Sequence, residues 1–179
     1  KGNLLYFSPS EQEPSYFTDS LLYICDHGDL GALGLIINRP LDLELKDLFN
    51  SLKIVENSKA KGNVYMGGPV NPGAIFILHS SEKKWESTME VSEDISLSTS
   101  EDAIQSIANC EGPENYLMTL GYAGWGVNQL ESELIENAWV VIPENKDVIF
   151  NPDPRKQMEE LSKFVGYDVR MISPDFGNA

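Results

Sequence analysis

The sequence GYAGWGVNQLE, residues 121–131, is the stretch that best indicates the fold of this chain. Its first six residues contain three glycines and two aromatic residues, and a predicted helix follows directly. Because glycine permits positive φ and close approach to the backbone, we expect a tight turn here. Such a turn can direct N–H groups toward an anion beside a helix N-terminus. Alternatively, it is only a corner beneath a packed Trp125.

Strand and helix patterns alternate irregularly on both sides of this turn. Apolar runs predict strands over residues 3–7, 21–26, 33–38, 64–66, 74–79, 86–91, 95–97, 116–120, 139–142 and 168–172. Helices are expected after capping signals at Asp42, at the Ser98–Glu101 capping box, at Asn128 and at Asp153-Pro154. Two of the strands, 21–26 and 33–38, form a predicted hairpin that Pro40 ends. Polar loops are expected over residues 9–14 and 57–61. The irregular order favours an α+β fold over a doubly wound sheet.

Length and composition are those of one globular domain, and we expect residues 1–179 to form a single unit. The chain has 179 residues, of which 41% are hydrophobic and 23% charged. It contains no run of 18 apolar residues and no recognisable signal peptide, so we expect neither a membrane span nor secretion. Because Lys1 stands where a starting Met would be, we expect that a few N-terminal residues are missing.

Charge and cysteine content argue against several classes of function. The net charge of −15 opposes binding to nucleic acid or to anionic lipid, which both require a basic surface. Cys25 and Cys110 are far apart, and the chain has only two histidines, so we expect no metal site. No fingerprint of a cofactor is present, and none is expected. Two isolated cysteines are typical of a reducing cytoplasm.

Four stretches, taken in order, resemble a known bacterial family. They are Gly31-Ala32-Leu33-Gly34-Leu35-Ile36-Ile37-Asn38-Arg39-Pro40, Val64-Tyr65-Met66-Gly67-Gly68-Pro69-Val70, the stretch from Gly121 to Glu133, and Asn137-Ala138-Trp139. Their order and spacing are similar to those of the YqgE/AlgH family, and the resemblance runs from about Gly2 to the C-terminus. One departure lies at the end of the chain, where family members often finish in Gly-His-Ala and this chain has Gly177-Asn178-Ala179.

The resemblance implies a single-domain α+β fold, with a small closed β-barrel or a bifurcated mixed sheet surrounded by helices. It implies no established catalytic activity. Some family members are regarded as transcriptional regulators because of a genetic link to exopolysaccharide control. That link implies a regulatory role here, through a protein partner rather than direct DNA contact, because the charge opposes DNA binding.

The Gly-rich turn is the strongest candidate for a concave binding site. Its candidate residues are Gly121, Gly124, Trp125, Gly126, Gln129 and Glu133. The glycines could expose N–H groups to a carboxylate or phosphate, whereas Glu131 and Glu133 would favour a cation or an amine. Gln129 and Glu133 lie four residues apart and share a helix face. The alternative is that Tyr122 and Trp125 simply pack in the core.

Two other motifs supply candidate binding residues. Asn38-Arg39-Pro40 places a guanidinium, which can hold a carboxylate or phosphate bidentately, at a strand end. An internal salt bridge is the alternative for Arg39. Gly67-Gly68-Pro69 is either a turn or a loop that admits a ligand, although it lacks the Lys and Ser/Thr of a phosphate-binding loop.

Cys25-Asp26-His27 is the one pattern that suggests a nucleophile. Residues two apart share a face of an extended strand, so the imidazole of His27 could activate the thiol of Cys25. The alternative is a buried core cysteine followed by a turn histidine, since free cysteine is among the most buried residue types.

The leading hypothesis is a non-enzymatic cytosolic binding or regulatory module. Its surface would combine the Gly-rich turn, Arg39 and the Gly67-Gly68-Pro69 loop, and we predict that these three converge in space. The partner would be another protein or a small molecule. The alternative is an unrecognised enzyme with a small-molecule site at Gly121–Gly126 and Arg39, which would use Arg39 with Glu133, or Cys25 with His27.

Overall fold

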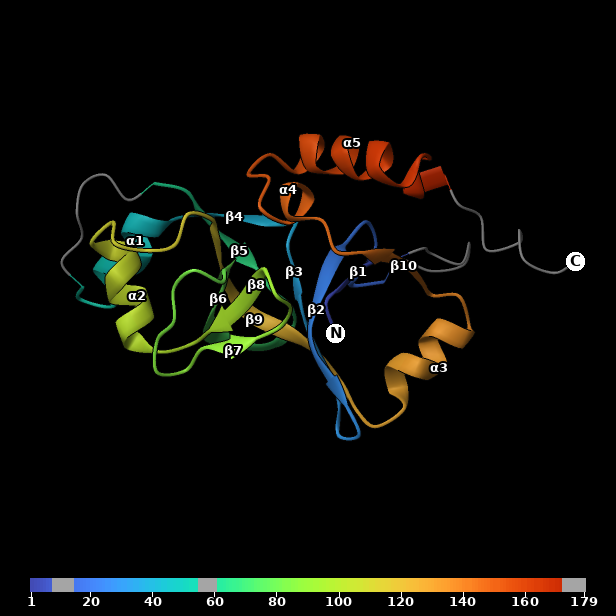
Figure 1. Cartoon of the computed structure of the whole chain (residues 1–179), viewed down its shortest axis with the longest axis horizontal. Helices are drawn as coiled ribbons and strands as arrows, with labels where there is room; N and C mark the ends of the chain where they lie inside the picture. Colours follow the sequence, from blue (N-terminus) through green and yellow to red (C-terminus); the bar gives the residue numbers. More distant parts are fainter. Residues whose placement is uncertain (8–14, 55–60, 172–179) are drawn as a thin grey trace, which may run out of the picture.

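The computed structural model describes residues 1–7, 15–54 and 61–171 (Figure 1). Its strands are β1 (Asn3–Phe7), β2 (Leu21–Gly28), β3 (Gly31–Ile36), β4 (Pro40–Glu44), β5 (Asn63–Met66), β6 (Val70–Ser80), β7 (Met89–Glu90), β8 (Ile95–Ser98), β9 (Tyr116–Trp125) and β10 (Trp139–Pro143). Its helices are α1 (Leu45–Ser51), α2 (Glu101–Ala108), α3 (Gln129–Ile135), α4 (Lys146–Ile149), α5 (Pro154–Val165) and the short 3₁₀ helix η1 (Val169–Met171). This mixture confirms the α+β expectation.

All ten strands belong to one curled sheet that stays open. Its main path runs β10-β1-β2-β3-β9-β6-β8-β7, and the two end strands do not pair with each other in the described residues. The expected closed β-barrel is therefore wrong. Instead the sheet branches at β9, because β5 pairs parallel to β9 and antiparallel to β4. This arrangement agrees with the alternative expectation of a bifurcated mixed sheet.

The Gly-rich stretch is strand rather than turn through most of its length. Strand β9 continues past Leu120 to Trp125, and its last residues pair with β3, with Ala32 opposite Trp125. Its first half lies between β6 and β5. Gly121, with φ of 71°, lies between the two halves, so its conformational freedom lets one strand serve both branches of the sheet.

Two of the expected helix starts are wrong, because the residues concerned belong to strands whose pairing the local sequence does not show. Asp42 lies within β4, which Pro40 begins, and α1 follows Glu44 without a side-chain cap. Ser98 lies within β8, and α2 follows Ser100, whose hydroxyl bonds to Asp102 rather than to a backbone N–H. The expected capping box is therefore absent, because the β6–β8 pairing includes Ser98.

Other local expectations have mixed outcomes. The hairpin of β2 and β3 is confirmed, and Asp153 caps α5 by accepting a hydrogen bond from the N–H of Arg155 at 2.9 Å. Asn128 precedes α3 in a left-handed conformation and makes no side-chain cap bond. Of the expected strand at 86–91 only the two residues of β7 are present. In place of the expected strand at 168–172, the chain forms the short helix η1. The short helix α4 was not expected. The loop 9–14, most of the loop 57–61 and the tail from residue 172 lie outside the described residues.

Helices cover the sheet in two groups, which Figure 1 shows near β4–β5 and near β1–β2. Helices α1 and α2 pack on β5, β6 and β9 around the buried ring of Phe49. Helices α4 and α5 pack on β1 and β2, with Leu161 fully buried. A third cluster joins Trp125, Leu130 and Trp139 where α3 meets the sheet. None of the described helices is both long and apolar enough to cross a membrane.

Candidate functional site

Gly67, Gly68 and Gly121 meet where β3, β5 and β9 come together. The N–H of Gly67 donates to the carbonyl of Leu120, and the carbonyl of Gly67 accepts from the N–H of Ile36, each at 2.8 Å. A Cβ on Gly68 would lie 2.1 Å from the carbonyl carbon of Tyr122. These glycines therefore allow strands to approach closely, and the backbone groups of Gly67 are bonded to neighbouring strands.

Asn38 and Arg39 adjoin this junction, but their side chains hydrogen-bond to other residues of the same chain. The carbonyl of Arg39 accepts from the N–H of Met66, which places it beside β5. The Arg39 guanidinium donates to the carbonyls of Tyr16 and Thr18, at 2.8 and 2.6 Å, and lies over the Tyr16 ring. Asn38 bonds to Leu21 N–H and to the Asp19 carbonyl. Among the described residues Arg39 forms no salt bridge, so the internal salt bridge considered for it is not seen there, and its guanidinium is held by two backbone carbonyls.

Glu133 holds the other end of the Gly-rich stretch together. One oxygen of its carboxylate accepts from the indole N–H groups of Trp125, at 2.9 Å, and Trp139, at 2.7 Å. The other oxygen accepts from the Gln129 amide at 3.0 Å, while the Gln129 carbonyl accepts from the N–H of Gly126. Trp125 is only 6% exposed. This network supports the packing interpretation of Trp125.

Cys25 and His27 do not form a thiol–imidazole pair. Cys25 is fully buried, its Sγ lies against the carbonyl of Tyr23, and burial raises the pKa of its thiol far above the ordinary value. His27 is exposed and bonds to the Glu131 carboxylate at 2.6 Å. The register of β2 against β3 shifts between Ile24 and Asp26, so the strand alternation assumed for these two residues does not hold.

A shallow depression of about 430 Å³ lies beside the C-terminal half of β9. Its lining includes Gly124, Trp125 and Gly126 among the predicted site residues, together with Leu30 and Val70, which were not predicted, and Tyr122, for which only core packing was considered. Because Gly124 has no side chain, the depression stays open above this residue. A Cβ placed there would lie 3.1 Å from the Tyr122 ring and 3.9 Å from Val70 Cγ2.

The predicted surface thus separates into a junction and a depression. Gly67 and Gly68 adjoin Gly121 and Tyr122 at the junction, with Arg39 next to Met66, whereas the depression lies along the next residues of β9. Pro69 is exposed between the two. A sequence signal for the depression was present in Leu30, an apolar residue at the tip of an otherwise polar hairpin turn.

The fold and this junction define a single-domain α+β protein built on a curled, mainly antiparallel sheet. The AlgH-like family model matches residues 4–170. The chain therefore belongs to the AlgH-like family, which confirms the resemblance drawn from the four sequence motifs.

Relatives from bacteria support this assignment along the whole chain. The chain is 37% identical to a UPF0301 protein of Idiomarina loihiensis, covering 100% of this chain and 98% of that protein. It is 40% identical to a UPF0301 protein of Thioalkalivibrio sulfidiphilus, covering 99% and 96%. The solution structure of the AlgH protein from Pseudomonas aeruginosa has a TM-score of 0.81 at 34% identity, covering 99% of this chain and 95% of that one. A crystal structure from Corynebacterium diphtheriae, at 18% identity and TM-score 0.70, shares the fold.

Proposed function

We propose that this protein is a non-enzymatic binding module that engages a protein partner at the depression beside β9. The observation that carries this proposal is an exposed apolar patch around a preformed concavity. Leu30 is 93% exposed, Val127 is 61% exposed and Val70 is 37% exposed. Leu30 and Val70 line the hollow, and exposed apolar side chains at a concavity are typical of interaction sites.

The hairpin tip touches the end of β9, which brings together the segments that carry these residues. A Cβ on Gly31 would lie 2.1 Å from the carbonyl oxygen of Trp125, so the backbones are in contact there. Leu30 and Val127 are each one or two residues from this contact, while Val70 lies across the floor formed by Gly124. The partner would therefore insert an apolar side chain between the hairpin tip and β6.

Charge defines the rest of the partner. Asp26 and Asp29 are exposed at the hairpin, and the chain carries a net charge of −15. An acidic surface favours association with a basic partner surface and disfavours nucleic acid. We infer that any transcriptional role is exerted through this partner, in the cytoplasm, and that the protein does not contact DNA directly.

Five of the predicted site residues belong to the depression or to the hydrogen bonds next to it. Gly124, Trp125 and Gly126 line the depression, whereas Gln129 and Glu133 fix Trp125. Arg39 and Glu133 are both occupied by internal hydrogen bonds, so no observation favours the alternative of an enzyme that uses them.

The experiment is affinity capture from bacterial lysate with the wild type and three variants. Gly124→Val fills the depression, Leu30→Ser removes its apolar wall, and Ile135→Ser is the control because Ile135 is 81% exposed on α3 without lining the depression. We expect one protein to be retained by the wild type and by Ile135→Ser, and to bind at least about tenfold more weakly to the other two. Added salt should weaken its binding. Equal retention by all four proteins, or no retained protein, would refute the proposal.

A further inference from the structure

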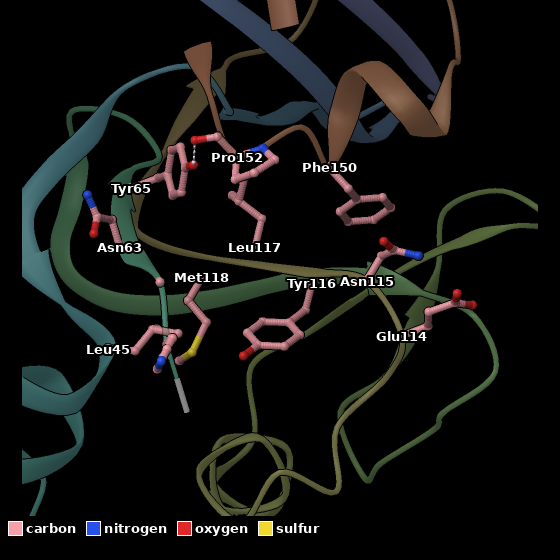
Figure 2. A pocket seen from close by; sticks show the side chains of 12 residues that line it. Leu45, Asn63, Tyr65, Glu114, Asn115, Tyr116, Leu117, Met118, Phe150 and Pro152 are labelled. Carbon is pink, nitrogen blue, oxygen red and sulfur yellow. Dashed lines mark hydrogen bonds between the residues drawn. The ribbon is translucent and has the colours of Figure 1, made fainter. Parts of the chain in front are cut away.

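A second pocket, separate from the depression, lies where β5 and the start of β9 meet the segment after α4. Its volume is about 260 Å³, slightly below the range of pockets for drug-sized ligands. Figure 2 shows Tyr116, Phe150 and Asn115 on its sides, with Asn63 toward one end and Glu114 at the other. The Tyr65 hydroxyl donates to the carbonyl of Pro152 at 3.2 Å, which fixes one wall.

Two aromatic side chains give this pocket flat apolar walls. Tyr116 and Phe150 are both partly exposed into it, from β9 and from the end of α4. Within the described part of the chain, neither ring contacts another aromatic ring. Phe150 also packs against the core cluster that contains Leu161, and Tyr116 against the cluster that contains Phe49. The part of each ring that lines the pocket can still contact the face of a planar ligand.

Three polar side chains of the pocket have no hydrogen-bond partner among the described residues. Among the described residues, nothing hydrogen-bonds to the side-chain amide of Asn115, to that of Asn63 or to the Tyr116 hydroxyl. Burial raises the pKa of Tyr116, so its hydroxyl stays protonated and able to donate. A side-chain amide offers hydrogen-bond donors and an acceptor, so it suits a ligand edge that carries an acceptor next to a donor.

Charge around the pocket disfavours an anionic ligand. Lys61 and Glu114 are the charged residues that line it, so their two formal charges balance. A neighbouring hollow shares Asn115 and Phe150 and adds Lys146, Asp147 and Glu160, which sum to one negative charge. A phosphate would gain little here, whereas a neutral ligand is not opposed.

We propose that this pocket binds a neutral, planar nitrogen heterocycle of nucleobase size, stacked on Tyr116 and Phe150, with its polar edge hydrogen-bonded to Asn115. This inference goes beyond the proposed protein-binding function, since none of the residues that line the pocket lines the depression. Asn63 and the Tyr116 hydroxyl would complete the contacts of the ligand edge.

The test is titration of the full chain with adenosine and cytidine, followed by NMR chemical-shift changes. Ribose serves as the control for the sugar, and adenosine monophosphate as the control for charge. We expect saturable binding of at least one nucleoside below about 10 mM, with shifts at Tyr116 and Phe150. Phe150→Leu keeps apolar volume but removes the ring, and should weaken binding at least about fivefold. Asn115→Ala should also weaken it, and serves as the second variant if Phe150→Leu fails to fold.

Leu30→Ser, in the separate depression, should leave nucleoside binding unchanged. Failure of both nucleosides to saturate would overturn the inference. So would equal binding of ribose, or shifts that map away from the pocket. Tighter binding of adenosine monophosphate than of adenosine would show a phosphate-directed site instead and would likewise overturn it. An unchanged affinity in a folded Phe150→Leu variant would exclude stacking on that ring.

Discussion

Replacing Glu133 by alanine tests whether the Gly-rich stretch is held by a buried hydrogen-bond network. The substitution leaves the indole N–H groups of Trp125 and Trp139 without their acceptor. Both tryptophans are buried, at 6% and 5% exposure, so water reaches these donors poorly. An unsatisfied buried donor costs about 1–3 kcal/mol, and some water will reach the half-buried site of Glu133. We therefore expect a loss of about 2–4 kcal/mol in the free energy of unfolding.

The assay is urea unfolding followed by tryptophan fluorescence, because two of the three tryptophans lie in this network. For a chain of this size the loss corresponds to a fall of about 5–15 °C in melting temperature. Glu131→Ala is the matched control on the same helix. It removes only the surface pair with His27, which solvent screens, and should leave the free energy of unfolding close to that of the wild type. If Glu133→Ala lay within about 0.5 kcal/mol of the wild type, the network would not stabilise this region and Glu133 would be free for another role.

Three further predictions address the junction, a buried histidine and the thiols. Gly68→Ala should cost about 2–4 kcal/mol in urea unfolding because its Cβ would overlap the backbone of Tyr122, whereas Gly73→Ala, with open space around it, should cost under about 1 kcal/mol. Desolvation lowers the pKa of His79 in the folded protein, so as the pH falls below about 6.5 the histidine of the unfolded chain is protonated first. The free energy of unfolding should therefore decrease there by at most about 1.4 kcal/mol per pH unit. His79→Gln should lose this part of the pH dependence, and equal slopes of stability against pH in the variant and the wild type would contradict the prediction. A thiol reagent should modify exposed Cys110 in the native protein and buried Cys25 only after unfolding, and rapid modification of both would contradict the buried position of Cys25.

The sequence predicted correctly those elements that depend on residues close together in the chain. The Asp153-Pro154 cap and the β2–β3 hairpin both follow from residues adjacent in sequence, and both are present. Ser98 shows the opposite case. Its spacing to Glu101 suits a capping box, but pairing with Ile77 on β6 includes it in a strand. A strand pairing between segments about 20 residues apart in sequence therefore overrides the local signal.

The candidate site shows the same division between local and distant information. The four-residue spacing of Gln129 and Glu133 predicted that they share a helix face, and their side chains do bond to each other. The sequence could not show that Trp139 also reaches Glu133, or that Arg39 would be held by the carbonyls of Tyr16 and Thr18. These partners are set by how the sheet curls, which depends on pairings across the whole chain.

Strand β9 lines both the pocket and the depression, yet these two sites should act independently. Tyr116 lines the pocket and Tyr122 lines the depression, six residues further along the same strand. At about 3.3 Å per residue they are separated by up to about 20 Å, well beyond the ~7–10 Å over which substitutions usually interact. The junction lies between them, where the N–H of Gly67 donates to the carbonyl of Leu120 on β9 and Gly68 lies against the backbone of Tyr122. Nucleoside binding and partner capture should therefore respond to Phe150→Leu and Leu30→Ser separately, and an effect of either variant on both would show that β9 transmits a conformational change across the junction.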